Sequence, residues 1–192
     1  MQKNILVLAS TLALVGFTSA TYSLGACPKV QLQKDFNITR YTGTWFEQAR
    51  DHTIPWEHGT CPQARYNLEA DGKSIAVTNS EFNPKTGKIE IAPANATCTN
   101  QGPACKVKFN NYLPEGDYRV LSTDYTNYAI VYSCTDIFGF SKEEYMWVLT
   151  RAQNVSDEIA SIVHEKITAG TPDFNLGNIQ MNNQAADCQY LA

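Results

Sequence analysis

The sequence of 192 residues has no cluster of lysine and arginine, and its formal net charge at pH 7 is -4. Because contacts with nucleic-acid phosphates need concentrated positive charge, we expect no nucleic-acid partner. Internal repeats and low-complexity tracts are also absent. After the first residues there is no apolar run of about 20 residues, the length that a membrane-spanning helix requires. These absences favour a single globular domain.

The motifs of common catalytic and metal sites are missing as well. The chain contains no G-x-S-x-G, C-x-x-C or H-E-x-x-H, and no Ser-His-Asp order. Of its three histidines, His52 and His58 fall in an expected loop and His164 in an expected helix. A metal site built from His52, His58 and Cys61 is an alternative. The main expectation is a protein with no metal, no cofactor and no enzymatic activity.

The start of the chain has the pattern of a secretory signal peptide. The segment MQKN is followed by an apolar run over residues 5–17 and by small residues that end at Ala20. We therefore predict a signal peptide at 1–20 and one secreted, extracellular domain at 21–192. A chain of that length can bury a sizeable core.

All cysteines and glycosylation motifs lie after Ala20, which fits secretion. An even number of cysteines in a secreted chain predicts a disulfide framework, although the sequence alone does not say which cysteines pair. Three N-x-S/T motifs mark candidate glycosylation sites at Asn37, Asn95 and Asn154.

Short apolar segments with turn residues between them predict an all-β protein. Turn sequences such as EADGKS, NPKTGK and LPEGD separate the segments. Eight strands joined in sequence by short connections favour an up-and-down antiparallel barrel or a sandwich. The expected strands are 44–50, 61–69, 74–82, 88–96, 104–110, 117–123, 127–134 and 143–151.

One amphipathic helix is expected after the strands. Ser156 can cap its N-terminus, and Gly170 with Pro172 can end it. Its apolar stripe must cover the outside of the sheet, and it consists of Ile159, Ile162, Val163 and Ile167.

Three short motifs in a fixed order resemble the signature of the lipocalins. Gly43-x-Trp45 opens the first strand, Thr123-Asp124-Tyr125 precedes the seventh, and Arg151 closes the eighth. The resemblance runs over nearly the whole chain after the signal peptide, from the segment CPKV at 27–30 to Cys188. It implies an eight-stranded up-and-down antiparallel lipocalin barrel with one C-terminal α-helix packed outside and one small ligand inside.

The resemblance also implies structural roles for these motifs and for the cysteines. Trp45 lies across the closed end of the barrel, Arg151 stacks on it, and Gly43 allows the chain to enter tightly. The implied disulfides are Cys27–Cys134 and Cys61–Cys188. Cys98 and Cys105 remain, and we expect them to form a local bridge.

Strand alternation and the resemblance together predict which side chains line the cavity. Met146 and Val148 should face outward to the helix. We expect no inward lysine or arginine above Arg151 and no pair of inner carboxylates. Such a wall suits a fatty acid, sterol, bilin or retinoid. The expected ligand-binding residues are Tyr66, Asn79, Phe109, Tyr118, Val120, Ala129, Val131, Tyr145, Trp147 and Leu149.

Three of the four loops expected at the open end carry bulky apolar residues. These side chains either fold over the mouth as a lid or form an apolar rim that touches a membrane or lipoprotein particle. They are Ile54, Trp56, Tyr112, Leu113, Ile137, Phe138 and Phe140. The functional expectation is a secreted carrier of a small hydrophobic ligand. The alternatives are a protein-interaction module on the same scaffold and an isomerase that uses a free cysteine thiol.

Overall fold

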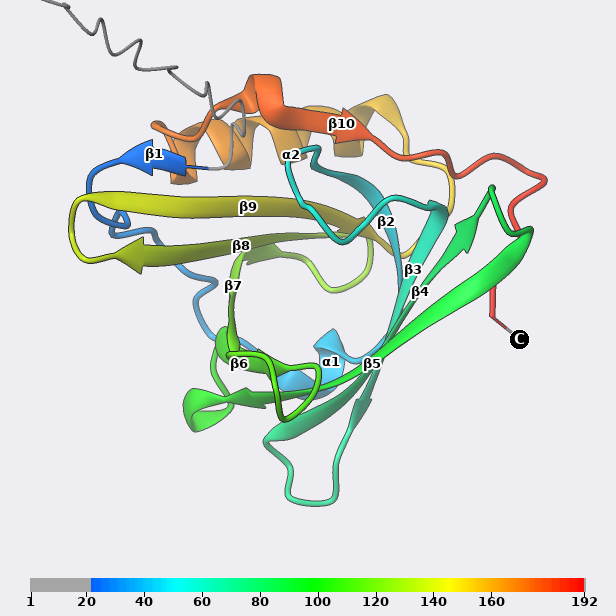
Figure 1. Ribbon diagram of the computed structural model, residues 1–192, viewed down its shortest axis with the longest axis horizontal. Coiled ribbons are helices and arrows are strands. Elements are labelled where there is room, and N and C mark those ends of the chain that lie inside the picture. The colour runs from blue at the N-terminus through cyan, green and yellow to red at the C-terminus, as the bar shows by residue number, and fades with distance from the viewer. Residues whose placement is uncertain (1–21, 192) are drawn as a thin grey trace, which may run out of the picture.

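The strands form one continuous antiparallel sheet that closes on itself into a barrel (Figure 1). The computed structural model describes residues 22–191, and the predicted signal peptide at 1–20 lies outside them. Each barrel strand pairs with the next, and the eighth pairs with the first. Within residues 22–191, no helix combines the length and apolar character needed to cross a bilayer.

The eight predicted strands are confirmed, with boundaries that differ by a few residues. Turn residues end the strands where the sequence predicts; Gly72 and Gly87, for example, adopt positive φ in two of the hairpins. The strands are β2 (Gly43–Asp51), β3 (Thr60–Leu68), β4 (Ser74–Asn83), β5 (Lys88–Cys98), β6 (Ala104–Lys108), β7 (Gly116–Thr123), β8 (Tyr128–Ile137) and β9 (Ser141–Thr150).

The predicted helix is α2 (Asp157–Gly170), and it packs on the outside of the barrel. The side chain of Ser156 accepts a hydrogen bond from the backbone N–H of Ile159 at 3.3 Å, as a capping residue should. Val163 and Ile167 are buried against Met146 and other outward residues of β8 and β9. The outward orientation predicted for Met146 and Val148 is therefore confirmed.

Several short elements surround the barrel and were not expected from the sequence. They are β1 (Tyr22–Leu24), α1 (Ile38–Tyr41), β10 (Ile179–Met181) and two 3₁₀ turns at Thr99–Gln101 and Leu176–Asn178. β1 extends the sheet beside β9, α1 lies at the closed end, and β10 pairs with the upper part of β2. Each is too short to produce a periodic sequence pattern.

Apolar residues form two separate cores, one inside the barrel and one between the barrel and α2. The inner core contains Trp45, Val120, Val131 and Leu149, while the outer core contains Ile130 and Met146. Because successive residues of a strand face opposite sides, β8 and β9 contribute to both cores. The inner core surrounds the candidate site.

Candidate ligand-binding site

The closed end of the barrel is sealed by Trp45 and Arg151. The Cζ atom of Arg151 lies 3.6 Å from the centre of the indole ring, and Trp45 is completely buried. The guanidinium also donates to the backbone oxygens of Thr44 at 2.7 Å and Thr42 at 2.8 Å. A cation over an indole stabilises by about 0.5–2 kcal/mol. Gly43 has a φ of 99°, and a Cβ there would lie 3.2 Å from Arg151 Nη1, which explains the glycine.

The segment Thr123-Asp124-Tyr125 forms the turn between β7 and β8 at the same closed end. Partial burial raises the pKa of Asp124, but hydrogen bonds to its carboxylate from the Asn127 side chain and from the backbone N–H groups of residues 126–128 outweigh burial and lower the pKa. Thr123 Oγ1 donates to the backbone oxygen of Tyr128 at 2.6 Å. Thr123 and Asp124 therefore shape a turn, while Tyr125 packs into the inner core at the closed end.

Three tyrosine hydroxyl groups meet above this closed end and form the floor of the site. The hydroxyl of Tyr118 lies 2.7 Å from that of Tyr41 and 3.2 Å from that of Tyr66. Burial raises the pKa of all three phenols, so they stay uncharged. Two hydrogen bonds among them use two of the three protons. One O–H donor therefore remains for another partner.

Most of the predicted lining residues lie on the inner face of the barrel. Tyr118 and Trp147 are partly buried against the inner core. Tyr145 contacts the ring of Trp147 at a centroid distance of 6.1 Å, and Asn79 pairs with Ala64 of the inner core. Phe109 is 39% exposed beyond the end of β6, so it lies at the mouth and not within the wall. The remaining lining residues belong to the inner core itself: Tyr66, Val120, Ala129, Val131 and Leu149.

The expectation that the inner wall lacks an arginine above Arg151 is wrong. Arg50 is 3% exposed and pairs across the β2–β9 ladder with Trp147, so it shares the inner face. Strict alternation from Trp45 would turn residue 50 outward. A β-bulge between Glu47 and Ala49 adds one residue to β2 and reverses the alternation beyond it.

The expectation that no two carboxylates meet on the inner face is also wrong. Nη1 of Arg50 lies 3.1 Å from a carboxylate oxygen of Glu47, 3.9 Å from Glu57 and 3.6 Å from Glu81. Nη2 donates to the backbone oxygen of Gly59 at 3.1 Å. A Cβ at Gly59 would lie 2.7 Å from the side chain of Glu81, so only glycine fits there. We call Arg50 and the three glutamates the polar wall.

Burial dominates the protonation of the polar wall. It raises the pKa of Glu47 to about 8, with a further contribution from the charge of Glu57, while Arg50 acts in the opposite direction. Burial also raises the pKa of Glu57, although that carboxylate accepts a hydrogen bond from Trp147 Nε1 at 3.0 Å. Glu47 is therefore largely protonated at neutral pH.

The sequence held a partial signal for this wall. Glu47 follows Trp45 by two residues and Glu81 follows Asn79 by two, so alternation alone places both inward. Glu57 comes from the loop between β2 and β3, for which alternation makes no prediction. Arg50 depends on the bulge, which has no sequence signature here.

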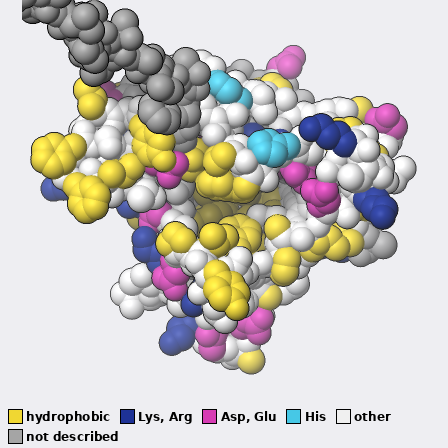
Figure 2. Space-filling view, in the orientation of Figure 1, with side chains coloured by type: hydrophobic (Ala, Val, Ile, Leu, Met, Phe, Trp, Pro, Cys, Tyr) yellow, Lys and Arg dark blue, Asp and Glu magenta, His cyan; other side chains and the backbone are white. Residues whose placement is uncertain are grey.

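The open end of the barrel is hollowed, and hydrophobic side chains border the hollow (Figure 2). Phe138 and Phe140 are 90% and 80% exposed in the turn between β8 and β9, and Tyr112 and Leu113 are exposed in the loop before β7. Ile54 is 2% exposed and so does not belong to the rim. Trp56 is 55% exposed, although its ring packs edge-on against Tyr145 at 5.3 Å. In the first loop Ile54 therefore folds inward while Trp56 stays at the rim, and the other two loops project outward.

The two implied disulfides, Cys27–Cys134 and Cys61–Cys188, are confirmed, and so is the expected local bridge Cys98–Cys105. No cysteine among residues 22–191 is free, and no group of metal-ligating side chains meets in that part of the chain. Cys61, which the alternative metal site required, is bonded to Cys188. Asn37, Asn95 and Asn154 are all exposed.

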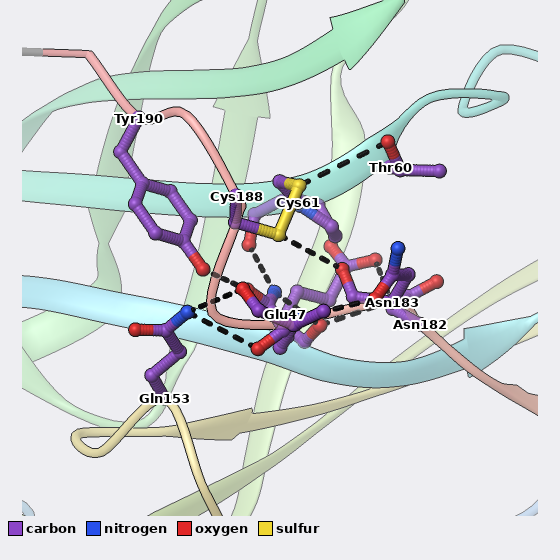
Figure 3. Close-up of a disulfide and its surroundings, with 11 residues drawn as sticks. Glu47, Thr60, Cys61, Gln153, Asn182, Asn183, Cys188 and Tyr190 are labelled. Carbon is purple, nitrogen blue, oxygen red and sulfur yellow. Dashed lines mark hydrogen bonds between the residues drawn. A yellow bond between two sulfur atoms is a disulfide. The ribbon is translucent and has the colours of Figure 1, made fainter. Parts of the chain in front are cut away.

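The Cys61–Cys188 bridge holds the C-terminal tail in a gap of the barrel wall (Figure 3). β2 pairs with β3 only as far as Phe46, and above that point the two strands diverge. The tail fills the gap, because Asn182 N–H donates to the oxygen of Gln48 and Cys61 N–H donates to that of Asn183. We call this filled gap the seam. Asn182 Nδ2 also donates to the carboxylate of Glu47 at 2.9 Å, which joins the seam to the polar wall.

Comparisons with known proteins agree with this geometry. The family model described as the lipocalin-like domain matches residues 36–182. Apolipoprotein D of Rattus norvegicus is 32% identical over 188 residues, which cover 96% of this chain and 97% of the relative. Bilin-binding protein of Pieris brassicae is 32% identical over 188 residues, 90% of this chain and 97% of the relative. The solved structure of insecticyanin from the tobacco hornworm Manduca sexta matches with a TM-score of 0.76 and 24% identity, covering 88% of this chain and 92% of that chain.

Proposed function

The chain belongs to the lipocalin family, and from that premise we propose that it is a secreted carrier of a small hydrophobic ligand. The observation that carries this proposal is the inner core, whose apolar and aromatic side chains surround a hollow that opens at one end. Binding removes apolar surface from water, which stabilises the complex by about 25 cal/mol for each Å² buried. Removal of residues 1–20 as a signal peptide and glycosylation at the exposed sequons belong to the same proposal.

Several ligand classes fit an apolar lumen. Fatty acids, sterols, bilins and retinoids all combine a large apolar body with a small polar group. The name of the Pieris brassicae relative indicates that it binds a bilin. That similarity makes a bilin one of the first ligands to test.

The proposal is tested by filling the lumen with one added side chain. Ala92 pairs with the inward residue Asn79 and is exposed, so Ala92→Trp would place a ring in the hollow without disturbing a packed core. The neighbouring Ile91→Trp adds the same ring on the outer face. We expect Ala92→Trp to weaken ligand binding by about tenfold or more and Ile91→Trp to leave it unchanged.

The measurement begins with native mass spectrometry of the protein purified from its own source, followed by organic extraction of whatever is bound. The ligand that is released is then used in fluorescence titrations of both variants. Equal ligand affinities in the two variants would show that the binding site lies outside the barrel. An empty protein that responds to none of the four ligand classes would favour the protein-interaction module.

Enzymatic activity through a cysteine nucleophile has no support in the described residues. All of their cysteines form disulfides, and such chemistry requires a thiolate. The name of the Pieris brassicae relative is that of a ligand-binding protein. Carriage of a ligand is therefore the function proposed.

We also propose that the exposed rim contacts a lipid surface, of a membrane or a lipoprotein particle, when ligand is loaded. Phe138 and Phe140 project beside the open end and have no covering element among the described residues. We expect Phe138→Asp with Phe140→Asp to abolish flotation with phospholipid vesicles, because two charges replace two apolar contacts. Thr86→Asp with Asn111→Asp adds the same charge on two other loops of the open end and serves as the control. Equal flotation of the wild type and the phenylalanine variant would refute the contact.

A further inference from the structure

The polar wall is not explained by carriage of a wholly apolar ligand. It lies toward the open end of the lumen, where β2 and β4 approach the first loop. Charged side chains are costly to bury in an apolar cavity unless a partner compensates them. Its composition therefore bears on which polar group a ligand can bring into the barrel.

The guanidinium of Arg50 is already occupied by the protein. Its two terminal nitrogens contact three carboxylates and one backbone oxygen, and the side chain is 3% exposed. A carboxylate on a ligand would have to displace these partners to reach the cation. It would find no accessible positive charge at this position.

What the polar wall presents to the lumen is negative charge and hydrogen-bond acceptors. The side chains of Glu57 and Glu81 retain 19% and 17% exposure, whereas that of Arg50 retains 3%. With Glu47 protonated, the carboxylate of Glu81 already balances the guanidinium, and Glu57, whose ionisation burial opposes, adds acceptor oxygens and any further negative charge. A ligand with a negative group would be repelled there, while a cation or a hydroxyl donor would be attracted.

A nearby residue points in the same direction. The amide oxygen of Asn79 is buried on the inner face and has no hydrogen-bond partner. A buried acceptor without a donor costs about 1–3 kcal/mol, which a donor on the ligand would recover. The Nε atom of Arg50 is also unpartnered, but its side chain is only 3% exposed and its terminal nitrogens are occupied by the glutamates.

We propose that the ligand of this barrel is an apolar molecule whose polar group is a hydrogen-bond donor, a hydroxyl or a protonated amine, and that the lumen discriminates against ligands that end in a carboxylate. This inference rests on the proposed carrier function. It removes fatty acids from the four ligand classes, counts against bilins as well because a bilin carries propionate carboxylates, and favours alcohols and amines of similar size.

Three probes with the same twelve-carbon chain separate these possibilities. Isothermal titration calorimetry with the mature protein at about pH 7.4 would compare dodecylamine, dodecan-1-ol and dodecanoate below their micelle concentrations. We expect the amine to bind at least about tenfold more tightly than the carboxylate, with the alcohol also ahead of the carboxylate. Dodecanoate binding as tightly as the amine would overturn the inference and leave the carrier function standing. Binding of none of the probes would also overturn the inference, while the titrations with the released ligand would still decide the carrier function.

Variants then assign the preference to the polar wall. Glu57→Gln with Glu81→Gln should reduce the ratio of amine to carboxylate affinity to less than about threefold. Glu115→Gln removes the same charge from an exposed position in an open-end loop and should leave the ratio unchanged. A ratio that persists in the double variant would locate the selectivity elsewhere. If the double variant does not fold, a salt series on the wild type replaces it, since a preference for the amine based on charge must shrink as salt rises.

Discussion

At the scale of single residues, Glu47 connects three parts of the molecule. It lies on the inner face two residues after Trp45, its carboxylate touches Arg50, and the tail residue Asn182 donates to it. Burial of Glu47 and the charge of neighbouring Glu57 both oppose the ionisation of Glu47. The charge of Glu47 therefore changes with pH near neutrality.

This raised pKa makes the stability of the protein depend on pH. The pKa of Glu47 is about 8 in the folded protein, against 4.5 as the ordinary value. Between these two pH values the folded state keeps a proton that the unfolded state has released, so stability falls as pH rises through this window. We expect Glu47 to contribute a loss of about 1–3 kcal/mol between about pH 5 and pH 9.

Urea denaturation across this pH range measures the effect. Glu47→Gln keeps the shape of the neutral side chain and cannot ionise, so its stability should fall less steeply than that of the wild type. The variant should therefore gain most over the wild type near pH 9. Parallel pH profiles for the two proteins would show that Glu47 has an ordinary pKa.

At the scale of elements, the seam is the part of the barrel wall where the C-terminal tail, and not a neighbouring barrel strand, provides the hydrogen bonds. There the tail joins the upper part of β2 to the start of β3, and the Cys61–Cys188 bridge fixes it. This bridge spans 127 residues, whereas Cys98–Cys105 spans 7. The entropy lost by the unfolded chain is larger for a longer closed loop.

Removal of the two bridges should therefore have different costs. We expect Cys61→Ser with Cys188→Ser to lower the free energy of unfolding by about 4–5 kcal/mol, and Cys98→Ser with Cys105→Ser by about 2 kcal/mol. Hydrogen exchange should also accelerate over residues 179–188 in the first variant while the closed end around Trp45 stays protected. Similar losses of stability and unchanged exchange in the tail would contradict this role of the bridge.

The elements that the sequence predicted well are those with repeated local signals. Eight alternating segments and their turn residues predict β2 to β9, and the stripe that includes Val163 and Ile167 predicts α2. The seam could not be predicted, because β10 is three residues long and its pairing with β2 depends on where β3 diverges. The bulge after Glu47 shows the same limit: alternation is correct up to the bulge and reversed beyond it.

At the scale of the whole molecule, the resemblance to lipocalins, and within them to apolipoprotein D, is confirmed. That resemblance supplied what local patterns could not, namely the closure of the barrel and the pairing of the cysteines. The apolar wall was predictable because it follows strand alternation. The polar wall was predictable only in part, since alternation places Glu47 and Glu81 inward but Arg50 depends on a bulge and Glu57 on a loop.

The arrangement of the two long disulfides also governs how the molecule would respond to a mechanical load. If the chain is pulled at both ends, force can pass from Cys27 along the chain to Cys61 and then across the bridge to Cys188. This is the shortest covalent route between the ends, so it becomes taut first. The strands β3 to β7 lie between Cys61 and Cys134 and would remain slack. An oxidised molecule would therefore stop extending long before its contour length is reached, and only reduction would allow the barrel to be drawn out into a line.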